Sequence, residues 1–280
     1  MSEWESRPAT PADVADIRAL LAAHGNDGPH DGVDTVGPYV RHLIDHARSM
    51  VCRDGDRLLA FGAAIDAGVA IHLTDLFVQP DRLGGGIGQP LLAALFDDRW
   101  PRTTFASEDP RALPIYIRAG MSPSWPNLYL DGDATALPDP GLATEPATPS
   151  ELAALERSWR NVDRPLDHAF WATEPGADPF VIREGGEAIA FAYARDRQMR
   201  PSRVISRMII RSGAEPWSVV AAALRRAGRG RRVGISVLGP SPALRPLLEA
   251  GFHIDDRDTF MTSEPDLIDP ARLCANPGML

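Results

Sequence analysis

The most informative part of the chain is the segment Val78-Gln79-Pro80-Asp81-Arg82-Leu83-Gly84-Gly85-Gly86-Ile87-Gly88-Gln89-Pro90-Leu91-Leu92. A strand pattern over residues 71–78 leads into it, and paired leucines at helical spacing lead out of it. Glycines in such a turn allow backbone N–H groups to approach an anion, and the N-terminus of the following helix adds partial positive charge. The segment therefore predicts a strand, an anion-binding turn and a helix, with backbone groups able to hold a pyrophosphate.

Two common phosphate-binding motifs do not fit this turn. A dinucleotide-binding motif that begins at Gly86 requires glycine at position 91, where Leu91 stands. A P-loop requires lysine, and all 29 basic residues of the chain are arginine. The absence of lysine also excludes a lysine Schiff base. Taken alone, the glycine run leaves a surface turn without a ligand as an alternative.

The same segment resembles the acyl-CoA-binding motif of the GNAT superfamily of N-acyltransferases. That motif is a strand ending in Val-x-Pro, a turn of the form Arg/Gln-x-x-Gly-x-Gly/Ala, and a helix with paired leucines. The positions in register are Val78, Pro80, Gly86, Gly88, Leu91 and Leu92. Two positions depart from the motif: Leu83 replaces the usual Arg or Gln, with Arg82 one place early, and Pro90 lacks an N–H donor.

A second GNAT motif, Asn-x-x-Ala-x-x-x-Tyr-x-x-x-Gly-Phe, follows at a suitable distance. The chain has Asp109, Ala112, Tyr116, Gly120 and Met121 at its positions. The two motifs together imply the GNAT fold and acetyl-CoA as co-substrate. The resemblance assigns the coenzyme contacts to Phe77, Val78, Arg82, Leu83, Gly84, Gly85, Gly86, Ile87, Gly88, Gln89, Asp109 and Ala112.

Acyl transfer from a thioester to an amine requires a deprotonated amine, a polarised carbonyl and a protonated leaving thiolate. The resemblance implies that a backbone N–H of Phe77 or Val78 polarises the carbonyl and that Tyr116 protonates the thiolate. A tyrosine of the core with one solvated end is the alternative for Tyr116.

The general base that deprotonates the amine is expected to be an acid in or near the strand predicted over 71–78. Asp75 stands where many GNAT relatives carry an acid, and an acid in an apolar strand must be paired, hydrated or functional. Glu108 is the second candidate. His72 lies on the same strand, one residue out of phase with Asp75, and we expect a structural role for it.

The resemblance places the acceptor site in the first two helices and their loop. That loop carries Asp27, His30, Asp31 and Asp34, whose acids favour a cationic amine. An ordinary solvated loop is the alternative.

The composition limits the class of protein. Hydrophobic residues make up 44% and charged residues 24% of 280 residues, which is typical of a globular chain with two domains. The net charge of −9 argues against a nucleic-acid or anionic-membrane partner. Cys52 and Cys274 are too few for a metal site or a disulfide framework. No signal-peptide or membrane-spanning pattern occurs, so we expect a cytoplasmic protein, and a homodimer stays open.

The order of elements repeats along the chain. Pro8-Ala9-Thr10-Pro11 recurs as Pro146-Ala147-Thr148-Pro149, each followed by an acid three residues after the threonine and by a helix pattern. Hairpin signals, strands over 71–78 and 206–211, and helices over 39–48, 91–96 and 217–226 complete the pattern. We therefore predict an N-terminal GNAT domain over 1–132, a linker over 133–141 and a C-terminal GNAT-like domain over 142–280.

The second half lacks the residues that the first half offers for catalysis. Its turn contains one glycine, Gly213, and an acid, Glu215, where a pyrophosphate would lie, and Leu247 stands in place of Tyr116. The prediction is an α/β fold, of α+β mixed-sheet type, built from two tandem GNAT-like domains. Each domain has a central, mostly antiparallel sheet with flanking helices, and the C-terminal one is degenerate.

The expected function is the transfer of an acetyl group from acetyl-CoA to a primary amine of a small cationic or polar molecule, without a metal. One alternative is an acyl-CoA-binding sensor or interaction protein without turnover. Another is a tandem-GNAT transferase that uses aminoacyl-tRNA, which predicts a basic groove that the net charge disfavours.

Overall fold

The computed structural model describes residues 4–25, 34–197 and 202–280. These residues form two compact units. Unit 1 contains the described residues up to Pro123, together with Met261–Pro265 and Pro277–Met279. Unit 2 contains Ser124–Phe260 without the undescribed positions, Asp266–Asn276 and Leu280.

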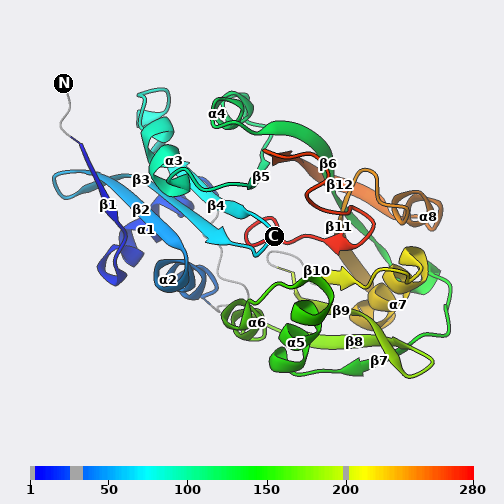
Figure 1. The fold of residues 1–280 in the computed structure, drawn as a ribbon. Coiled ribbons are helices and arrows are strands. Elements are labelled where there is room, and N and C mark those ends of the chain that lie inside the picture. The colour runs from blue at the N-terminus through cyan, green and yellow to red at the C-terminus, as the bar shows by residue number, and fades with distance from the viewer. Residues whose placement is uncertain (1–3, 26–33, 198–201) are drawn as a thin grey trace. The chain divides into compact units, whose positions relative to one another are not determined.

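Unit 1 is a mixed sheet covered by helices on both faces (Figure 1). Its strands, in spatial order, are β1 (Glu5–Pro8), β2 (Arg48–Asp54), β3 (Arg57–Asp66), β4 (Ile71–Val78) and β5 (Arg102–Ala106). Its helices are α1 (Val14–Ala22), α2 (Val36–His46), α3 (Gly88–Phe96) and α4 (Ala112–Arg118), with short 3-10 turns at Pro11–Asp13 and Pro80–Arg82. Neighbouring strands are antiparallel except β4 and β5, which are parallel.

Two hydrophobic clusters show which helices cover which face of this sheet. Ile17 and Leu20 of α1 pack with Leu43 of α2 in one cluster. Leu91 of α3 and Tyr116 of α4 pack in the other. The sheet is therefore buried on both faces, with α1 and α2 on one face and α3 and α4 on the other.

Unit 2 repeats this plan. Its strands are β6 (Ser122–Asp133), β7 (Ala143–Pro146), β8 (Asp178–Glu184), β9 (Glu187–Asp196), β10 (Arg203–Ile210), β11 (Arg232–Leu238), β12 (His253–Thr262) and β13 (Leu273–Cys274), although the start of β6 and the end of β12 belong to unit 1. The spatial order is β12-β6-β11-β10-β9-β8-β7, with β13 beside β10. Its helices are α5 (Pro149–Arg160), α6 (Pro165–Trp171), α7 (Pro216–Gly228) and α8 (Leu244–Glu249), with a 3-10 turn at Ala134–Ala136.

The helix starts predicted from the repeated Pro-Ala-Thr-Pro segments are confirmed. Asp13 accepts hydrogen bonds from the backbone N–H and the hydroxyl of Thr10, both at 2.9 Å. Glu151 accepts the same two bonds from Thr148, at 2.7 and 2.8 Å. Both acids thus satisfy polar groups at the start of a helical segment.

Most predicted elements are confirmed, with shifted ends. The strand over 71–78 is found as predicted, whereas the helix predicted over 39–48 begins at Val36 and ends at His46. The helix predicted over 91–96 begins earlier, at Gly88. The mixed α/β fold class is confirmed.

The compact units do not coincide with the two halves of the sequence. Strand β6, from the first half, lies almost wholly in unit 2, where it pairs with β11. Met261–Pro265 and Pro277–Met279, from the second half, lie in unit 1, and the N–H of Ser263 donates to the carbonyl of Arg102 at 2.9 Å. The boundaries 1–132, 133–141 and 142–280 stay a prediction, drawn from the sequence repeat.

The described residues lack two features, a membrane-spanning helix and a cluster of metal-ligating side chains. None of their helices is both long and apolar enough to cross a membrane. No group of three or more His, Cys, Asp or Glu side chains among them is arranged to hold a metal ion.

Candidate functional site

Strands β4 and β5 separate partway along their length. Their parallel pairing covers only Ile71 to Leu73 on β4 and Arg102 to Thr104 on β5. The rest of β4, as far as Val78, has no partner on that side among the paired residues of β5. The carboxyl end of β4 therefore leaves backbone groups available along the opening.

A β-bulge at Thr74 lies where this separation begins. Ala63 of β3 faces Asp75, and Ala64 faces Leu73, so Thr74 is the extra residue, and its hydroxyl donates to the carbonyl of Ala63 at 3.0 Å. An extra residue reverses the alternation of side chains along a strand. The expectation that His72 is out of phase with Asp75 is therefore wrong, because the bulge brings both onto one face.

The ladder between β3 and β4 shows which backbone groups face the opening. The N–H of Gln79 donates to the carbonyl of Leu59 at 2.8 Å, and Ala60 faces Val78. Hydrogen-bonded and non-hydrogen-bonded pairs alternate in an antiparallel ladder, so Phe77 pairs with β3, whereas Val78 directs its N–H and C=O away from it. Of the two backbone N–H groups predicted to polarise the thioester carbonyl, those of Phe77 and Val78, only that of Val78 therefore points away from β3 into the opening.

The glycine turn has the backbone conformation that its sequence requires. Gly84 and Gly86 have φ angles of +77° and +78°, which side chains with a Cβ rarely adopt. The N–H of Gly85 donates to the carbonyl of Arg82 at 3.1 Å. Within the described chain, the N–H groups of Gly86 and Gly88 donate to no other residue. They remain available at the N-terminus of α3, where an anion is favoured.

Pro90 occupies the first turn of α3, where helix N–H groups have no intrahelical acceptor. It thus costs the helix no hydrogen bond, although it removes one donor from the turn.

One pocket of about 370 Å³ collects the end of β4, the glycine turn and the start of α4. We call it the turn pocket. All predicted coenzyme contacts except Gly85 line it, and Tyr116, 8% exposed, lines it too. Its other lining residues are His24, Leu76, Ser107, Arg111, Ile115 and Arg118. The two sequence motifs, separated along the chain, therefore meet in one cavity.

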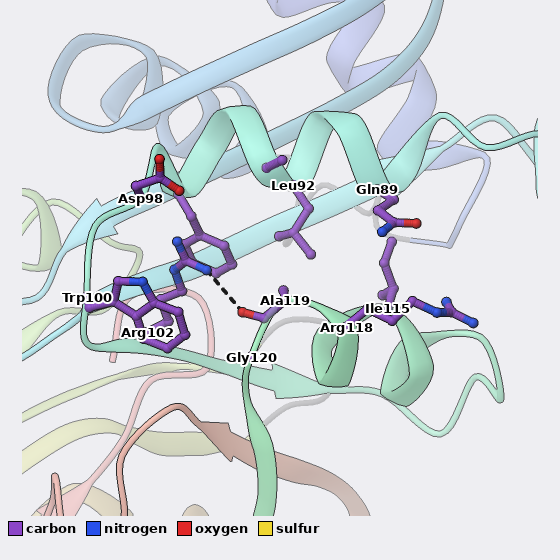
Figure 2. Close-up of a pocket in the computed structure, with 11 residues that line it drawn as sticks. Gln89, Leu92, Asp98, Trp100, Arg102, Ile115, Arg118, Ala119 and Gly120 are labelled. Carbon is purple, nitrogen blue, oxygen red and sulfur yellow. Dashed lines mark hydrogen bonds between the residues drawn. The ribbon is translucent and has the colours of Figure 1, made fainter.

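Figure 2 shows a second pocket, of about 300 Å³, between α3 and the end of α4. The guanidinium of Arg102 lies 4.1 Å from the ring centre of Trp100 and 4.7 Å from that of Phe96, and it donates to the carbonyl of Ala119 at 3.0 Å. Burial lowers the pKa of Arg102. The residues shared with the turn pocket are Gln89, Ile115 and Arg118.

Arginines supply the positive charge of the turn pocket. Arg82, Arg111 and Arg118 line it. Arg111 also donates from Nε to Asp109 at 2.8 Å, and this hydrogen bond, with the backbone N–H of Arg111, lowers the pKa of Asp109 to about 2. Asp109 is therefore a carboxylate at neutral pH and is already paired.

The two predicted bases lie outside the lining of the turn pocket. Asp75 is buried, and its carboxylate accepts a hydrogen bond from the hydroxyl of Tyr39 at 2.7 Å. Burial raises the pKa of Asp75, and the bond from Tyr39 opposes that effect. Glu108 is exposed to solvent.

The second half of the sequence contributes to the surroundings of Asp75. The hydroxyl of Tyr39 also lies 3.5 Å from the carbonyl oxygen of Gly278, and His72 Nε2 lies 2.9 Å from that of Pro277. This chain segment covers the face of β4 that carries His72 and Asp75.

The predicted acceptor residues are only partly described. Asp34 is exposed, accepts a hydrogen bond from the N–H of Gly37 at 3.0 Å and lies 3.2 Å from Arg18. Asp27, His30 and Asp31 lie outside the described residues.

Sequence reasoning missed His24. It lines the turn pocket, and its Nε2 lies 2.9 Å from the carbonyl oxygen of Val78. It belongs to neither motif and lies far from Val78 in sequence, so no local pattern could have identified it.

In unit 2 the position that corresponds to the anion site is occupied by the chain itself. Glu215 accepts hydrogen bonds from the N–H groups of Trp217 and Ser218, at 3.0 and 2.7 Å, at the start of α7. Leu247, at the position of Tyr116, is fully buried. The start of α7 thus carries its own carboxylate, whereas the start of α3 does not.

The strand of unit 2 that corresponds to β4 repeats the bulge but reverses the charge. Ser206 is the extra residue of β10, and its hydroxyl donates to the carbonyl of Tyr193 at 3.2 Å, as Thr74 does to Ala63. Arg207 follows it, at the position of Asp75, and is 1% exposed.

Glu156 of α5 neutralises part of the buried charge on Arg207. Its Oε1 accepts from Arg207 and from Arg160, each at 2.7 Å, and its Oε2 accepts from His168 at 2.8 Å. Burial raises the pKa of Glu156, but Arg207, His168 and Arg160 together lower it well below its usual range. Charged side chains therefore surround the position in unit 2 that corresponds to Asp75.

Comparison with known proteins identifies the fold. No protein-family model and no curated protein matches the sequence. A proposed acetyltransferase from Pyrococcus horikoshii has a similar structure, with a TM-score of 0.70, 13% identity, and coverage of 98% of this chain and 94% of that one. A GCN5-related N-acetyltransferase from Sphaerobacter thermophilus is also similar, with a TM-score of 0.56 and 16% identity. The match covers 97% of this chain and 98% of that one.

A tandem GNAT protein from the clavulanic acid biosynthesis pathway is similar over 94% of this chain and the whole of its own length. Its TM-score is 0.61 and its identity 18%. Identities this low establish the fold alone. The chain has the GNAT fold that the two motifs imply, in the tandem form that the sequence repeat predicts.

Proposed function

We propose that the protein is an N-acetyltransferase that moves an acetyl group from acetyl-CoA directly to a primary amine of a small polar or cationic molecule. One observation supports this most strongly. The open end of β4, the unpaired N–H groups of the glycine turn and Tyr116 all border a single pocket.

Each part of that pocket suits one part of a thioester of coenzyme A. The N–H groups of Gly86 and Gly88, with Arg82 beside them, suit the diphosphate. The N–H of Val78, directed away from β3, suits the thioester carbonyl, where it stabilises the oxyanion as the amine attacks. Tyr116 donates a proton to the departing thiolate.

The charge of the chain supports a cationic or polar amine as acceptor. A net charge of −9 favours the approach of cations and disfavours a polyanion such as nucleic acid.

Calorimetric titration of acetyl-CoA into matched glycine variants tests this proposal. Gly86 and Gly213 both have positive φ, +78° and +92°, and neither has an atom within 4 Å of an added Cβ. A Glu at either position therefore produces similar backbone strain. Gly86→Glu places a carboxylate at the proposed diphosphate site and should weaken binding by at least about 100-fold, or about 2.7 kcal/mol. Gly213→Glu should leave the affinity unchanged.

Equal loss of binding in both variants, or no binding by the unaltered protein, would contradict the proposal. A panel of amines assayed by free-thiol release then tests turnover. Binding without thiol release from any amine would identify a coenzyme-binding protein without transferase activity.

A further inference from the structure

His24 lies just beyond the end of α1 and is held in the turn pocket from two sides. Its Nε2 is 2.9 Å from the carbonyl oxygen of Val78, and its ring centre lies 5.3 Å from that of Phe77. A carbonyl oxygen only accepts hydrogen bonds, so Nε2 carries a proton. In the neutral ring Nδ1 is then an acceptor, and no described residue forms a hydrogen bond with it.

The other titratable groups that line the pocket are poor bases. Asp109 is paired with Arg111, which lowers its pKa to about 2. Arginine side chains stay protonated, and Tyr116 is required in its protonated form as the acid. Asp75 and Glu108 do not line the pocket at all. Imidazole is the side-chain group whose ordinary titration falls near neutral pH, where general bases are most effective.

We propose that His24 is the general base of the transfer, an inference that rests on the proposed function. Nδ1 of His24 takes one proton from the ammonium group of the acceptor and releases it to solvent afterwards. The free amine then attacks the thioester carbon, so that the C–N bond forms and the C–S bond breaks. The thiolate takes a proton from Tyr116, and the second amine proton restores Tyr116.

The end of β4 orients this base. The carbonyl of Val78 fixes the protonated nitrogen on Nε2, which leaves Nδ1 to accept, and Phe77 packs against the ring. A base oriented by a third group is the usual arrangement in enzymes that activate a nucleophile. One residue, Val78, thus directs its N–H to the thioester carbonyl and uses its C=O to hold the base.

Two substitutions separate the base from a merely structural side chain. His24→Ala removes both ring nitrogens, whereas His24→Gln keeps an N–H donor for Val78 and has no basic nitrogen. With a lysine-type amine, whose pKa is about 10.4, both should lower kcat by about 100-fold or more. The KM for acetyl-CoA should change little. Added imidazole should restore part of the kcat of His24→Ala, which it would not do for a structural defect.

The control is His253→Ala, because His253 is exposed in unit 2 and should not affect kcat. Unchanged kcat in His24→Gln, or no effect of imidazole on His24→Ala, would overturn the role of His24 while the transferase function stands. No acetyl-CoA binding and no thiol release by the unaltered protein would overturn both.

Discussion

At the scale of single residues, Tyr116 carries the clearest chemical expectation. It is buried, borders the turn pocket and lies on α4, the helix that carries Ala112 and Tyr116 of the second motif. If it protonates the leaving thiolate, Tyr116→Phe removes the proton donor and leaves the ring in place. We expect kcat to fall by about 100-fold, with the Kd for acetyl-CoA changed less than about threefold. Free-thiol release and calorimetry measure the two quantities.

Tyr129→Phe provides the control for Tyr116→Phe. The hydroxyl of Tyr129 donates to Asp258 within unit 2, so its removal should leave kcat unchanged. Wild-type kcat in Tyr116→Phe, with an amine that the protein acetylates well, would remove Tyr116 from the acid role.

The residues of the turn pocket divide into those that the sequence could predict and those that it could not. Gly86 and Tyr116 lie in motifs whose spacing reflects a turn and one helix, so local pattern was sufficient. His24 reaches Val78 through the packing of α1 on the sheet, which no spacing reveals. The sequence singles out Asp75 because an acid in an apolar strand is unusual, but its partner Tyr39 is known only from the fold.

At the scale of elements, the starts of the corresponding helices α3 and α7 differ in what binds their backbone N–H groups. The first turn of α3 has N–H groups directed at a cavity, whereas Glu215 satisfies those of α7. The sequence could predict this contrast, because the acid is local. It could not predict the bulges in β4 and β10, because an extra residue is defined by register with the neighbouring strand.

The buried ion-pair cluster around Glu156 is an element-scale feature with a measurable effect on stability. Glu156→Gln leaves Arg207, which is 1% exposed, without a neutralising charge. Breaking a buried pair by removal of one partner costs about 3–5 kcal/mol. We expect a loss of that size in the free energy of unfolding from urea denaturation at pH 7. The surface pair of Arg245 and Glu249 gives the control, since solvent screens this pair and Arg245→Ala should leave the free energy of unfolding nearly unchanged.

The ion-pair cluster around Glu156 also predicts how the free energy of unfolding depends on pH. Folding lowers the pKa of Glu156, so near that pKa the folded state binds fewer protons than the unfolded state. The Glu156 carboxylate therefore contributes its full stabilisation at pH values above the unfolded pKa of about 4.3. It is lost as the pH falls below about 4. Glu156→Gln should therefore flatten part of the acid limb of the stability curve. An unchanged acid limb would show that Glu156 is not charged in the folded state.

At the scale of the whole molecule, the sequence repeat and the compact units divide the chain differently. The repeat predicts two similar halves, and the mixed sheets and paired bulges agree with it. Long-range strand pairing assigns β6 to unit 2 and Met261–Pro265 to unit 1. Sequence patterns identify a strand by its own residues but not by its partner, so this exchange could not be predicted.

Because β6 belongs to unit 2 and Met261–Pro265 to unit 1, each compact unit needs residues from both halves of the sequence. Met261 is fully buried in the cluster that contains Leu91 and Tyr116, so a fragment of residues 1–132 lacks part of its own core. The same fragment carries Leu130, a core residue of unit 2, on a strand without its partner β11. Large-to-small changes in a core cost about 2–5 kcal/mol each, and an isolated fragment loses several such contacts at once.

We therefore expect residues 1–132 alone to show no cooperative unfolding transition and no measurable binding of acetyl-CoA. Co-expressed fragments 1–139 and 140–280 should associate, unfold cooperatively and bind acetyl-CoA with the affinity of the intact chain, because the break falls at the exposed Asp139. Circular dichroism during urea denaturation and calorimetric titration measure both properties. A monomeric fragment 1–132 with full affinity would mean that the segments from the second half are dispensable, and that the repeat, rather than the compact unit, is the functional module.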